Sequence, residues 1–320
     1  MTIKISPRLL MLMLVALILY LLVLLTENVS AEDAIIASSV ETAIEVTPSG
    51  GTRDDLRRLL HVPECPAGAQ LQSIESENDL ARVVFDVCGV ALSGLYAPGD
   101  AGFVMVVHGT ASTPEAAFGL TPDDYMHELA RTLNESGYAV FAPEILTQPY
   151  GSEDINAARN EADRRLRPVG RSLVGNELMA LTAILDYYGG GAVYGISLGG
   201  YLAFHTCALS DAVTACGVSG YIEDRAGKLI GAGYPQPYWR ETNSDYMTVD
   251  GYLLLFDDVQ VATLISAPLY VETGALDPRS AYVGDVVEWM LDAGVDATNY
   301  IGEGGHETYS AAFMAWLEGV

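Results

Sequence analysis

From about residue 79 to the end of the chain, short apolar runs alternate with amphipathic runs. The short runs are rich in valine, isoleucine and aromatic residues and are bounded by glycine or proline, which predicts β-strands. These strands are expected at 80–87, 90–96, 102–107, 138–143, 191–194, 213–220, 268–273 and 298–301. The amphipathic runs repeat apolar residues every three or four positions and predict helices at 121–136, 172–188, 201–206, 251–265, 281–293 and 307–317.

Several predicted strands are apolar at every position, as in Phe103 to Val107. Such strands are typical of sheets that helices cover on both faces. The alternation of strands with helices therefore predicts an α/β fold, a doubly wound and mostly parallel sheet. The first two strands, at 80–87 and 90–96, are expected to form a hairpin. Residues 146–170 and 222–250 have no clear period and are predicted to be irregular.

We assign one domain to residues 79–320, because no internal repeat or second compact unit is evident. Residues 32–78 are mixed in composition, with a short helical run at 54–60. This stretch is predicted to be a linker or stalk that leads to the domain.

The first 31 residues differ from the rest. Lys4 and Arg8 precede an uninterrupted apolar run at 9–25, and Val29-Ser30-Ala31 follows. A positive flank before an apolar run is typical of a secretory signal or a membrane anchor. Because the run is longer than most signal-peptide cores, we favour a signal anchor, a transmembrane helix, over a cleaved signal peptide. Either predicts a membrane-anchored or secreted protein whose domain lies outside the cytoplasm, in the periplasm or extracellular space.

The charge of the chain limits its partners. Among 320 residues, 42 are acidic and 16 are basic, giving a formal net charge of −26. Such a surface repels nucleic-acid phosphates, which excludes nucleic acid as a partner. The sequence does not indicate an oligomeric state.

The four cysteines would lie in an oxidising compartment if the domain is exported. Four cysteines allow three pairings, among which we favour Cys65, in a proline-flanked loop, with Cys88. Cys207 and Cys216 would tie the end of one helix to the next strand, with two free buried thiols as an equally weighted alternative. The spacing of the cysteines matches no metal site, and we expect no metal and no cofactor.

A Gly-x-Ser-x-Gly motif lies between a predicted strand and a predicted helix. It reads Gly195-Ile196-Ser197-Leu198-Gly199. A serine on a sharp strand-to-helix turn needs small neighbours two residues away on each side, because the backbone folds closely over itself. The N-terminus of the following helix also favours negative charge at the turn. Ser197 is therefore the candidate nucleophile, provided that a base, an acid and oxyanion donors exist elsewhere.

Elimination among five histidines selects the base. His61 precedes the predicted domain, His127 lies inside a predicted helix, His205 is two turns beyond the candidate serine, and His108 ends an early strand. His306 remains, in a glycine-rich loop directly after the last predicted strand. Loops at the carboxyl ends of strands build the site in an open α/β sheet.

Asp277 is the candidate acid that would orient His306. It follows the penultimate predicted strand, and Pro278 after it suits a fixed turn. The chain order is then serine, aspartate, histidine. The rival acids are Asp224, after an earlier strand, and Glu272, within the strand itself.

Two backbone N–H groups are needed to stabilise an oxyanion. One is expected from Leu198, the residue after the nucleophile. The other is expected from the loop after an early strand, His108-Gly109-Thr110. We choose Thr110, with Ala111 as the neighbouring possibility, and expect His108 to brace the loop.

Taken together, these motifs look like the α/β-hydrolase superfamily. They are Val106 to Thr110, Gly195 to Gly200, Gly274 to Asp277 and Gly305-His306. Within the superfamily, Gly-x-Ser-x-Gly-Gly-Tyr-Leu-Ala resembles the dienelactone-hydrolase, esterase and prolyl-oligopeptidase-like branch. The resemblance covers residues 80–320. It implies that Ser197 takes up an acyl group and that His306 activates water to release it.

The resemblance also implies a short cap or lid insertion at 222–262. Tyr234, Tyr238 and Trp239 there would line an acyl or aromatic pocket or pack the loop. The implied activity is that of a serine hydrolase, and a serine nucleophile favours a carboxylesterase that cleaves a small-molecule ester. An amidase or peptidase of the same fold is the alternative. A non-catalytic binding protein is a third hypothesis, which we disfavour.

Arginines between residues 159 and 171 stand out in so acidic a chain. They are Arg159, Arg164, Arg165, Arg167 and Arg171. They would attract an anionic substrate or form a solvated helix face paired with Glu161 and Asp163. We favour the solvated face, because exposed ion pairs of this kind are common on helices.

Overall fold

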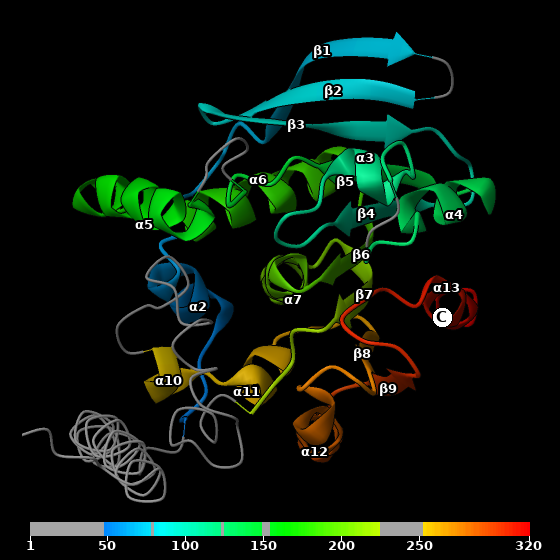
Figure 1. The fold of residues 1–320 in the computed structure, drawn as a ribbon. Helices are drawn as coiled ribbons and strands as arrows, with labels where there is room; N and C mark the ends of the chain where they lie inside the picture. The colour runs from blue at the N-terminus through cyan, green and yellow to red at the C-terminus, as the bar shows by residue number, and fades with distance from the viewer. Residues whose placement is uncertain (1–47, 78–79, 123–124, 149–153, 225–251) are drawn as a thin grey trace, which may run out of the picture.

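The computed structural model describes residues 48–77, 80–122, 125–148, 154–224 and 252–320 (Figure 1). Its strands are β1 (Ala69–Glu77), β2 (Leu80–Val87), β3 (Val90–Ala97), β4 (Phe103–Val107), β5 (Ala139–Pro143), β6 (Gly191–Ile196), β7 (Val213–Ser219), β8 (Leu269–Gly274) and β9 (Ala297–Gly302). Its helices are α2 (Arg53–Leu59), α3 (Pro114–Ala117), α4 (Leu129–Glu135), α5 (Ile155–Leu166), α6 (Leu173–Tyr187), α7 (Leu198–Leu209), α10 (Tyr252–Leu255), α11 (Asp258–Ala262), α12 (Ser280–Asp292) and α13 (Ser310–Leu317), with a 3₁₀ turn η1 (Arg167–Val169).

All the strands belong to one sheet, in the order β1-β2-β3-β5-β4-β6-β7-β8-β9. The pairs β1–β2, β2–β3 and β3–β5 are antiparallel, and every other pair is parallel. The predicted hairpin is confirmed as β2 and β3. The predicted α/β fold with a mostly parallel sheet is confirmed as well. The carboxyl ends of β4, β6, β7, β8 and β9 consequently share one edge of the sheet.

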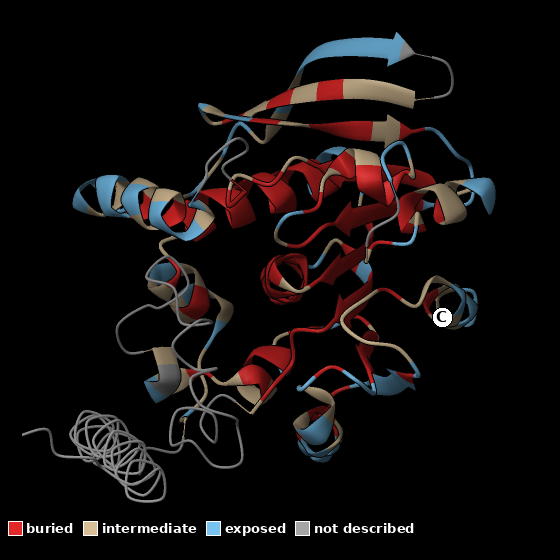
Figure 2. Ribbon diagram, in the orientation of Figure 1, coloured by how far each residue is buried: buried red, intermediate tan, exposed pale blue. Residues whose placement is uncertain are grey.

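Apolar side chains divide between the two faces of the sheet. On β4, Phe103, Met105 and Val107 join one buried cluster, while Val104 and Val106 join the other. This follows from the alternation of side chains along a strand. Helices α6 and α7 cover the first face, and α4 and α13 lie on the other side of the sheet (Figures 1 and 2).

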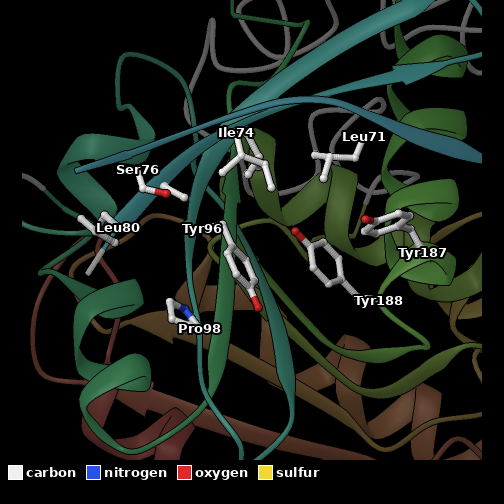
Figure 3. Close-up of a pocket in the computed structure, with 10 residues that line it drawn as sticks. Leu71, Ile74, Ser76, Leu80, Tyr96, Pro98, Tyr187 and Tyr188 are labelled. Atoms are coloured by element: carbon white, nitrogen blue, oxygen red, sulfur yellow. The ribbon is translucent and has the colours of Figure 1, made fainter. Parts of the chain in front are cut away.

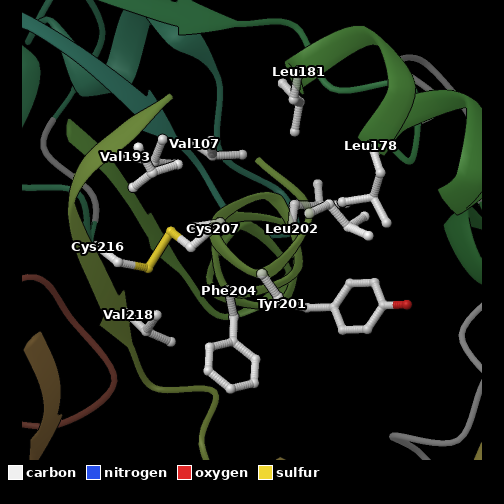
Figure 4. Packing of buried hydrophobic residues seen from close by; sticks show 14 of the residues in the cluster. Val107, Leu178, Leu181, Val193, Tyr201, Leu202, Phe204, Cys207, Cys216 and Val218 are labelled. Atoms are coloured by element: carbon white, nitrogen blue, oxygen red, sulfur yellow. A yellow bond between two sulfur atoms is a disulfide. The ribbon is translucent and has the colours of Figure 1, made fainter. Parts of the chain in front are cut away.

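Helix α7 is buried along its whole length. Figure 4 shows it between the strands and α6, with Tyr201, Leu202, Phe204 and Cys207 pointing into the cluster. A helix that is apolar on all sides belongs in the core of a protein. The core therefore fixes the helix that follows the Gly-x-Ser-x-Gly motif.

Both predicted cysteine pairs are disulfides in the structure. Cys65 and Cys88 are joined with their Cα atoms 5.7 Å apart. Cys207, in α7, is joined to Cys216, in β7, with 6.2 Å between the Cα atoms. The alternative of free thiols at the second pair is therefore wrong.

The predicted linker at 32–78 requires a correction. Residues 53–77 belong to the folded domain, because β1 pairs with β2 along its length and α2 packs on the core. The helical run expected at 54–60 is confirmed as α2, and its Leu56 is fully buried. Strand β1 lies at an edge of the sheet and is largely exposed, so its sequence has no apolar face that would reveal it.

Two further predicted elements differ from the structure. Residues 146–170 were expected to be irregular, but α5 lies within them. The buried residues of α5 are Arg159 and Asp163, which are themselves charged. The helix therefore shows no repeat of apolar residues by which the sequence could predict it. The helix expected at 121–136 is restricted to α4, because His127 and Glu128 have φ of 45° and 54° and interrupt it.

The arginine prediction is correct for part of α5 only. The side chains of Arg164 and Arg165 are exposed and pair with Glu161, as expected of a solvated face. Arg159 is 2% exposed, so the prediction is wrong for this residue.

Some predictions fall outside the described residues. These are the apolar run at 9–25, the remainder of the linker at 32–47, and most of the proposed cap, including Tyr234, Tyr238 and Trp239. Among the helices that the structure describes, none is long and apolar enough to cross a membrane. The predicted helix at 251–265 corresponds to two short helices, α10 and α11.

Substitution of Leu56 tests whether α2 is part of the domain. Leu56→Ala removes a fully buried side chain, so we expect the free energy of unfolding to fall by about 2–5 kcal/mol. Arg58→Ala, on the exposed side of the same helix, is expected to change it by less than about 1 kcal/mol. Chemical denaturation of the three proteins gives the comparison. Equal stability of L56A and the wild type would mean that α2 does not stabilise the domain.

Candidate active site

Ser197 lies at the junction of β6 and α7 in a strained backbone conformation. Its φ is 58° and its ψ is −119°, a backbone conformation that residues other than glycine rarely adopt. Such strain costs about 1–3 kcal/mol and persists only where the surroundings enforce it. Here the Ser197 N–H donates a hydrogen bond to the Ser219 carbonyl, at 2.9 Å. The turn thus fixes the serine at the carboxyl edge of the sheet.

The glycines of the motif are required by close backbone contacts. A Cβ atom on Gly195 would overlap the carbonyl oxygen of Gly199, and one on Gly199 would overlap the carbonyl oxygen of Val107. The packing of this turn therefore requires small residues on both sides of Ser197, as the sequence predicted.

His306 and Asp277 form a hydrogen-bonded pair in the loops after β9 and β8. His306 Nδ1 lies 2.5 Å from Asp277 Oδ2. The Asp277 side chain is fully buried, whereas that of His306 is 34% exposed. Because a carboxylate only accepts, His306 donates through Nδ1, which leaves Nε2 as the ring nitrogen able to take a proton.

Two residues, His306 and Arg279, stabilise the charge of Asp277. Burial by itself would raise its pKa, but the hydrogen bond from His306 and the charge of Arg279 hold the pKa below its ordinary value. Asp277 Oδ1 accepts hydrogen bonds from the Arg279 backbone N–H at 3.0 Å and from Arg279 Nη1 at 3.1 Å. The carboxyl group is therefore ionised at neutral pH and can stabilise an imidazolium.

The residue that accepts a hydrogen bond from His306 Nδ1 is Asp277 rather than either rival acid. Glu272 instead accepts hydrogen bonds from the Tyr194 hydroxyl and, at 3.1 Å, from the Tyr309 N–H. Burial raises the pKa of Glu272, and its hydrogen-bond partners oppose this rise. The other rival, Asp224, lies in the segment after β7, whereas His306 Nδ1 is hydrogen-bonded to Asp277.

Gly220 connects the His306 pair to the Ser197 turn. It follows Ser219, whose carbonyl group holds the Ser197 N–H. A Cβ atom on Gly220 would lie 2.7 Å from His306 Cε1 and 2.8 Å from Nδ1. The imidazole thus lies against the end of β7, the strand next to the one that carries Ser197.

The loop after β4 reaches the other side of Ser197. A Cβ atom on Gly109 would lie 2.8 Å from the Ile196 carbonyl oxygen and 3.0 Å from Ser197 Cβ. His108 is fully buried, and its Nδ1 donates to the Gly109 carbonyl at 2.9 Å, as expected of a bracing residue. The loop that was expected to supply an oxyanion donor therefore lies against Ser197, the candidate nucleophile.

Hydrogen bonding distinguishes the two candidate donors of this loop. The Ala111 N–H donates to Gln148 Oε1 at 3.3 Å. Within the described part of the chain, the Thr110 N–H has no acceptor. Leu198 is the first residue of α7, where N–H groups have no partner inside the helix. Thr110 and Leu198 thus remain the candidate oxyanion donors.

Comparison with solved structures identifies the fold. A protein from Bacteroides fragilis described as an acetyl xylan esterase aligns with a TM-score of 0.64 at 14% identity, covering 89% of this chain and 94% of its own. The acetyl xylan esterase from Paenibacillus sp. R4 aligns with a TM-score of 0.56 at 16% identity, covering 86% and 98%. The acylaminoacyl peptidase from Pyrococcus horikoshii aligns with 0.54 at 17% identity, covering 78% of this chain and 42% of its own.

The chain has the α/β-hydrolase fold. No protein-family model and no curated protein matches the sequence. At identities this low, the similarity shows the fold alone, and the candidate catalytic residues have to be identified from the site itself. In the α/β-hydrolase fold, Ser197, Asp277 and His306 occupy loops at the carboxyl edge of the sheet, where such sheets bind ligands.

Tyr125 also lies at this site, and the sequence alone did not indicate it. Its hydroxyl donates to the Thr110 carbonyl at 2.7 Å, and its ring centre lies 6.2 Å from that of His306. It was predicted as one apolar position of a helix, but it precedes α4 and turns toward the site. No pattern in the sequence separates this tyrosine from the other apolar positions of the predicted helix.

Tyr125 is held by contacts between its own segment and the loop of His306. The Thr308 N–H donates to the Tyr125 carbonyl at 2.8 Å. His127 Nε2 lies 2.7 Å from Glu307 Oε2, and this hydrogen bond holds the pKa of Glu307 below its usual range. The left-handed backbone at His127 and Glu128 therefore lies next to the site, as strained residues often do.

A separate pocket of about 420 Å³ lies between β1–β3 and the end of α6 (Figure 3). It is lined mainly by Tyr96, Tyr187, Tyr188, Leu71, Ile74 and Leu80. Tyr187 and Tyr188 come just before β6 begins, whereas Ser197 follows the other end of that strand. The pocket therefore lies at the opposite edge of the α/β-hydrolase sheet from the candidate nucleophile.

The described residues contain no cluster of three or more potential metal ligands among histidine, cysteine, aspartate and glutamate. The expectation of a site without a metal remains a prediction.

The lowered pKa of Asp277 predicts how stability depends on pH. A carboxyl group whose pKa is lower in the folded state stabilises the fold above its unfolded pKa, near 3.8, and this contribution is lost as the pH falls through the folded value. Asp277→Asn is therefore expected to be less stable than the wild type at pH 7. The difference should shrink as the pH is lowered below about 4. Urea unfolding of both proteins across this range measures it, and a constant difference would contradict the assignment.

Proposed function

We propose that this protein is a serine hydrolase that cleaves carboxylic esters with a Ser197–His306–Asp277 triad. The observation that carries the proposal is the His306–Asp277 pair at 2.5 Å, packed against the strand end that also holds the strained Ser197 turn. A nucleophile at a sharp turn, a base oriented by a buried carboxylate, and free N–H groups beside the nucleophile are the parts that acyl transfer requires.

The reaction proceeds in two steps. His306 Nε2 takes the proton of the Ser197 hydroxyl as Ser197 Oγ attacks the ester carbonyl, and the Thr110 and Leu198 N–H groups stabilise the resulting oxyanion. The bond to the alcohol oxygen then breaks, and His306 returns the proton to the departing alcohol. In the second step, His306 removes a proton from water, which attacks the acyl-enzyme. The carboxylic acid leaves, and Ser197 regains its proton.

The choice of ester over amide rests on the structures that share the fold. Two of them are described as acetyl xylan esterases. The acylaminoacyl peptidase has a similar fold, which keeps amide cleavage as the second candidate activity. The proposed substrate is a small ester, and the strongly acidic chain makes nucleic acid an unsuitable partner.

The proposal includes export of the domain, with the apolar run at 9–25 as a membrane tether or a signal. Two disulfides support it, because disulfides persist in oxidising compartments. The positive residues Lys4 and Arg8 would stay on the cytoplasmic side.

Removal of the nucleophile tests the proposal directly. The wild-type protein is expected to react covalently with a fluorophosphonate probe and to hydrolyse p-nitrophenyl acetate. Ser197→Ala should lose the labelling entirely and lower kcat by roughly 10⁴- to 10⁶-fold, and His306→Ala should do nearly the same. Ser210→Ala, at the far end of α7, serves as the control. A wild-type protein that does not label would sink the proposal.

Paired substrates separate esterase from amidase. We expect kcat/KM for p-nitrophenyl acetate, butyrate and octanoate to exceed that for the matching p-nitroanilides by more than the ratio of the uncatalysed rates. The acyl length with the highest kcat/KM then defines the substrate class. A larger rate enhancement for the anilides would favour the amidase alternative.

A further inference from the structure

Helix α5 presents polar residues to solvent on most of its surface, yet one of its arginines is buried. Arg159 is 2% exposed, whereas Arg164 and Arg165 further along the helix have largely exposed side chains. Burying a guanidinium group is costly unless its N–H groups are paired. The contacts of Arg159 therefore indicate what its position achieves.

The guanidinium group joins two separate loops of the carboxyl edge. Its Nε donates to the Thr147 carbonyl, in the loop after β5. Its Nη2 donates to Thr110 Oγ1 at 3.1 Å, in the loop after β4, and to Gln148 Oε1 at 3.2 Å. Two donors at fixed angles suit this geometry, because the planar fork of arginine binds two acceptors at once.

A buried carboxyl group stands behind the same loop. Glu177, from α6, accepts a hydrogen bond from the Thr147 N–H at 2.8 Å. Burial raises the pKa of Glu177 to about 7, while hydrogen bonds from Thr147 and Leu146 and, to a smaller extent, the charge of Arg159 oppose this rise. The backbone of Thr147 is thus held at both of its polar groups, by Glu177 at the N–H and by Arg159 at the carbonyl. This makes the loop after β5 a fixed support for the guanidinium.

The loop of Thr110 is held at several points around its free N–H. Tyr125 binds the Thr110 carbonyl, Gln148 binds the Ala111 N–H, and His108 binds the Gly109 carbonyl. Arg159 binds the Thr110 side chain directly and also binds the Gln148 oxygen that receives the Ala111 N–H. Of the polar groups at Thr110, the backbone N–H is the one left for a ligand in the described residues.

We propose that Arg159 is a positioning residue of the oxyanion hole: through Thr110 Oγ1 and Gln148, it fixes the direction of the Thr110 N–H. The inference rests on the proposed hydrolase function. Oxyanion donors act because they are already oriented when charge develops in the transition state, so a loosened donor lowers the rate of the chemical step. Substrate binding in the ground state depends less on this orientation, and the effect should therefore fall on kcat rather than KM.

Thr110→Val tests the contact between Arg159 and Thr110 Oγ1 without removing the backbone N–H that would bind the oxyanion. Valine has nearly the shape of threonine and keeps the backbone N–H, but it lacks the oxygen that accepts from Arg159. We expect kcat for p-nitrophenyl acetate to fall by about 10- to 100-fold, as for a small misplacement of a catalytic group. KM should change by less than about twofold. Thr110→Ser, which retains the oxygen, should lose clearly less kcat than T110V.

Arg159→Lys tests the other partner of the contact. Lysine keeps the positive charge but cannot bind several acceptors at once as the planar guanidinium does. The kcat of R159K should therefore fall by about as much as that of T110V. The double variant T110V/R159K should be no slower than the slower single variant, because both changes break the same contact. Arg165→Met, on the exposed side of α5, is the matched control and should retain wild-type kcat. A thermal melt of each variant identifies any that fail to fold.

The outcomes separate this inference from the proposed function. If Ser197→Ala abolishes hydrolysis but T110V keeps the wild-type kcat, the positioning role of Arg159 is wrong and the hydrolase proposal stands. An increase in KM at constant kcat in T110V would likewise overturn it, because it would indicate a role in substrate binding. If Ser197→Ala remains active, the hydrolase proposal itself fails. A loss of kcat in T110V at constant KM, with partial recovery in T110S, supports the inference even if R159K does not fold.

Discussion

The strained backbone at Ser197 is the constraint on which the rest of the site depends. A φ of 58° at a residue that carries a side chain is tolerated only because neighbouring segments hold it in place. The same close approach that excludes side chains at Gly195 and Gly199 brings the backbone of β4 and its following loop against the turn. The position of the candidate nucleophile and the position of the proposed oxyanion donor are therefore set by one packing arrangement.

Two carboxyl groups near the carboxyl edge illustrate how surroundings assign roles. Asp277 is fully buried but is paired with His306 and Arg279, and its pKa is lowered. Glu272 is equally buried but faces Tyr194 and the Tyr309 N–H, and its pKa is raised by burial. Only the carboxyl group with cationic neighbours is suited to stabilise an imidazolium. The hydrogen bonds of Glu272 instead connect β6, the strand that leads to Ser197, with the loop that follows His306.

The site is built on loops, and these loops are fixed by polar contacts with one another. The His306 loop is linked to the Tyr125 segment through Thr308 and Glu307, and Tyr125 in turn holds the Thr110 carbonyl. Rigid support of this kind is what a preoriented catalytic site requires, because free loops would have to be ordered in each turnover. The buried core around α7 supports the elements from which these loops extend.

The sequence by itself determined the elements with a strong period and the order of the candidate catalytic residues. Strands that are apolar on both faces, such as β4, and the close backbone turn at Ser197 leave clear patterns. Strand β1 and helix α5 left none, because an exposed edge strand and a mainly solvated helix bury too few side chains to create a period. The roles of Tyr125 and Arg159 were decided only by the tertiary structure. Their contacts join segments distant in the chain, and nothing in their local sequence reflects such a contact.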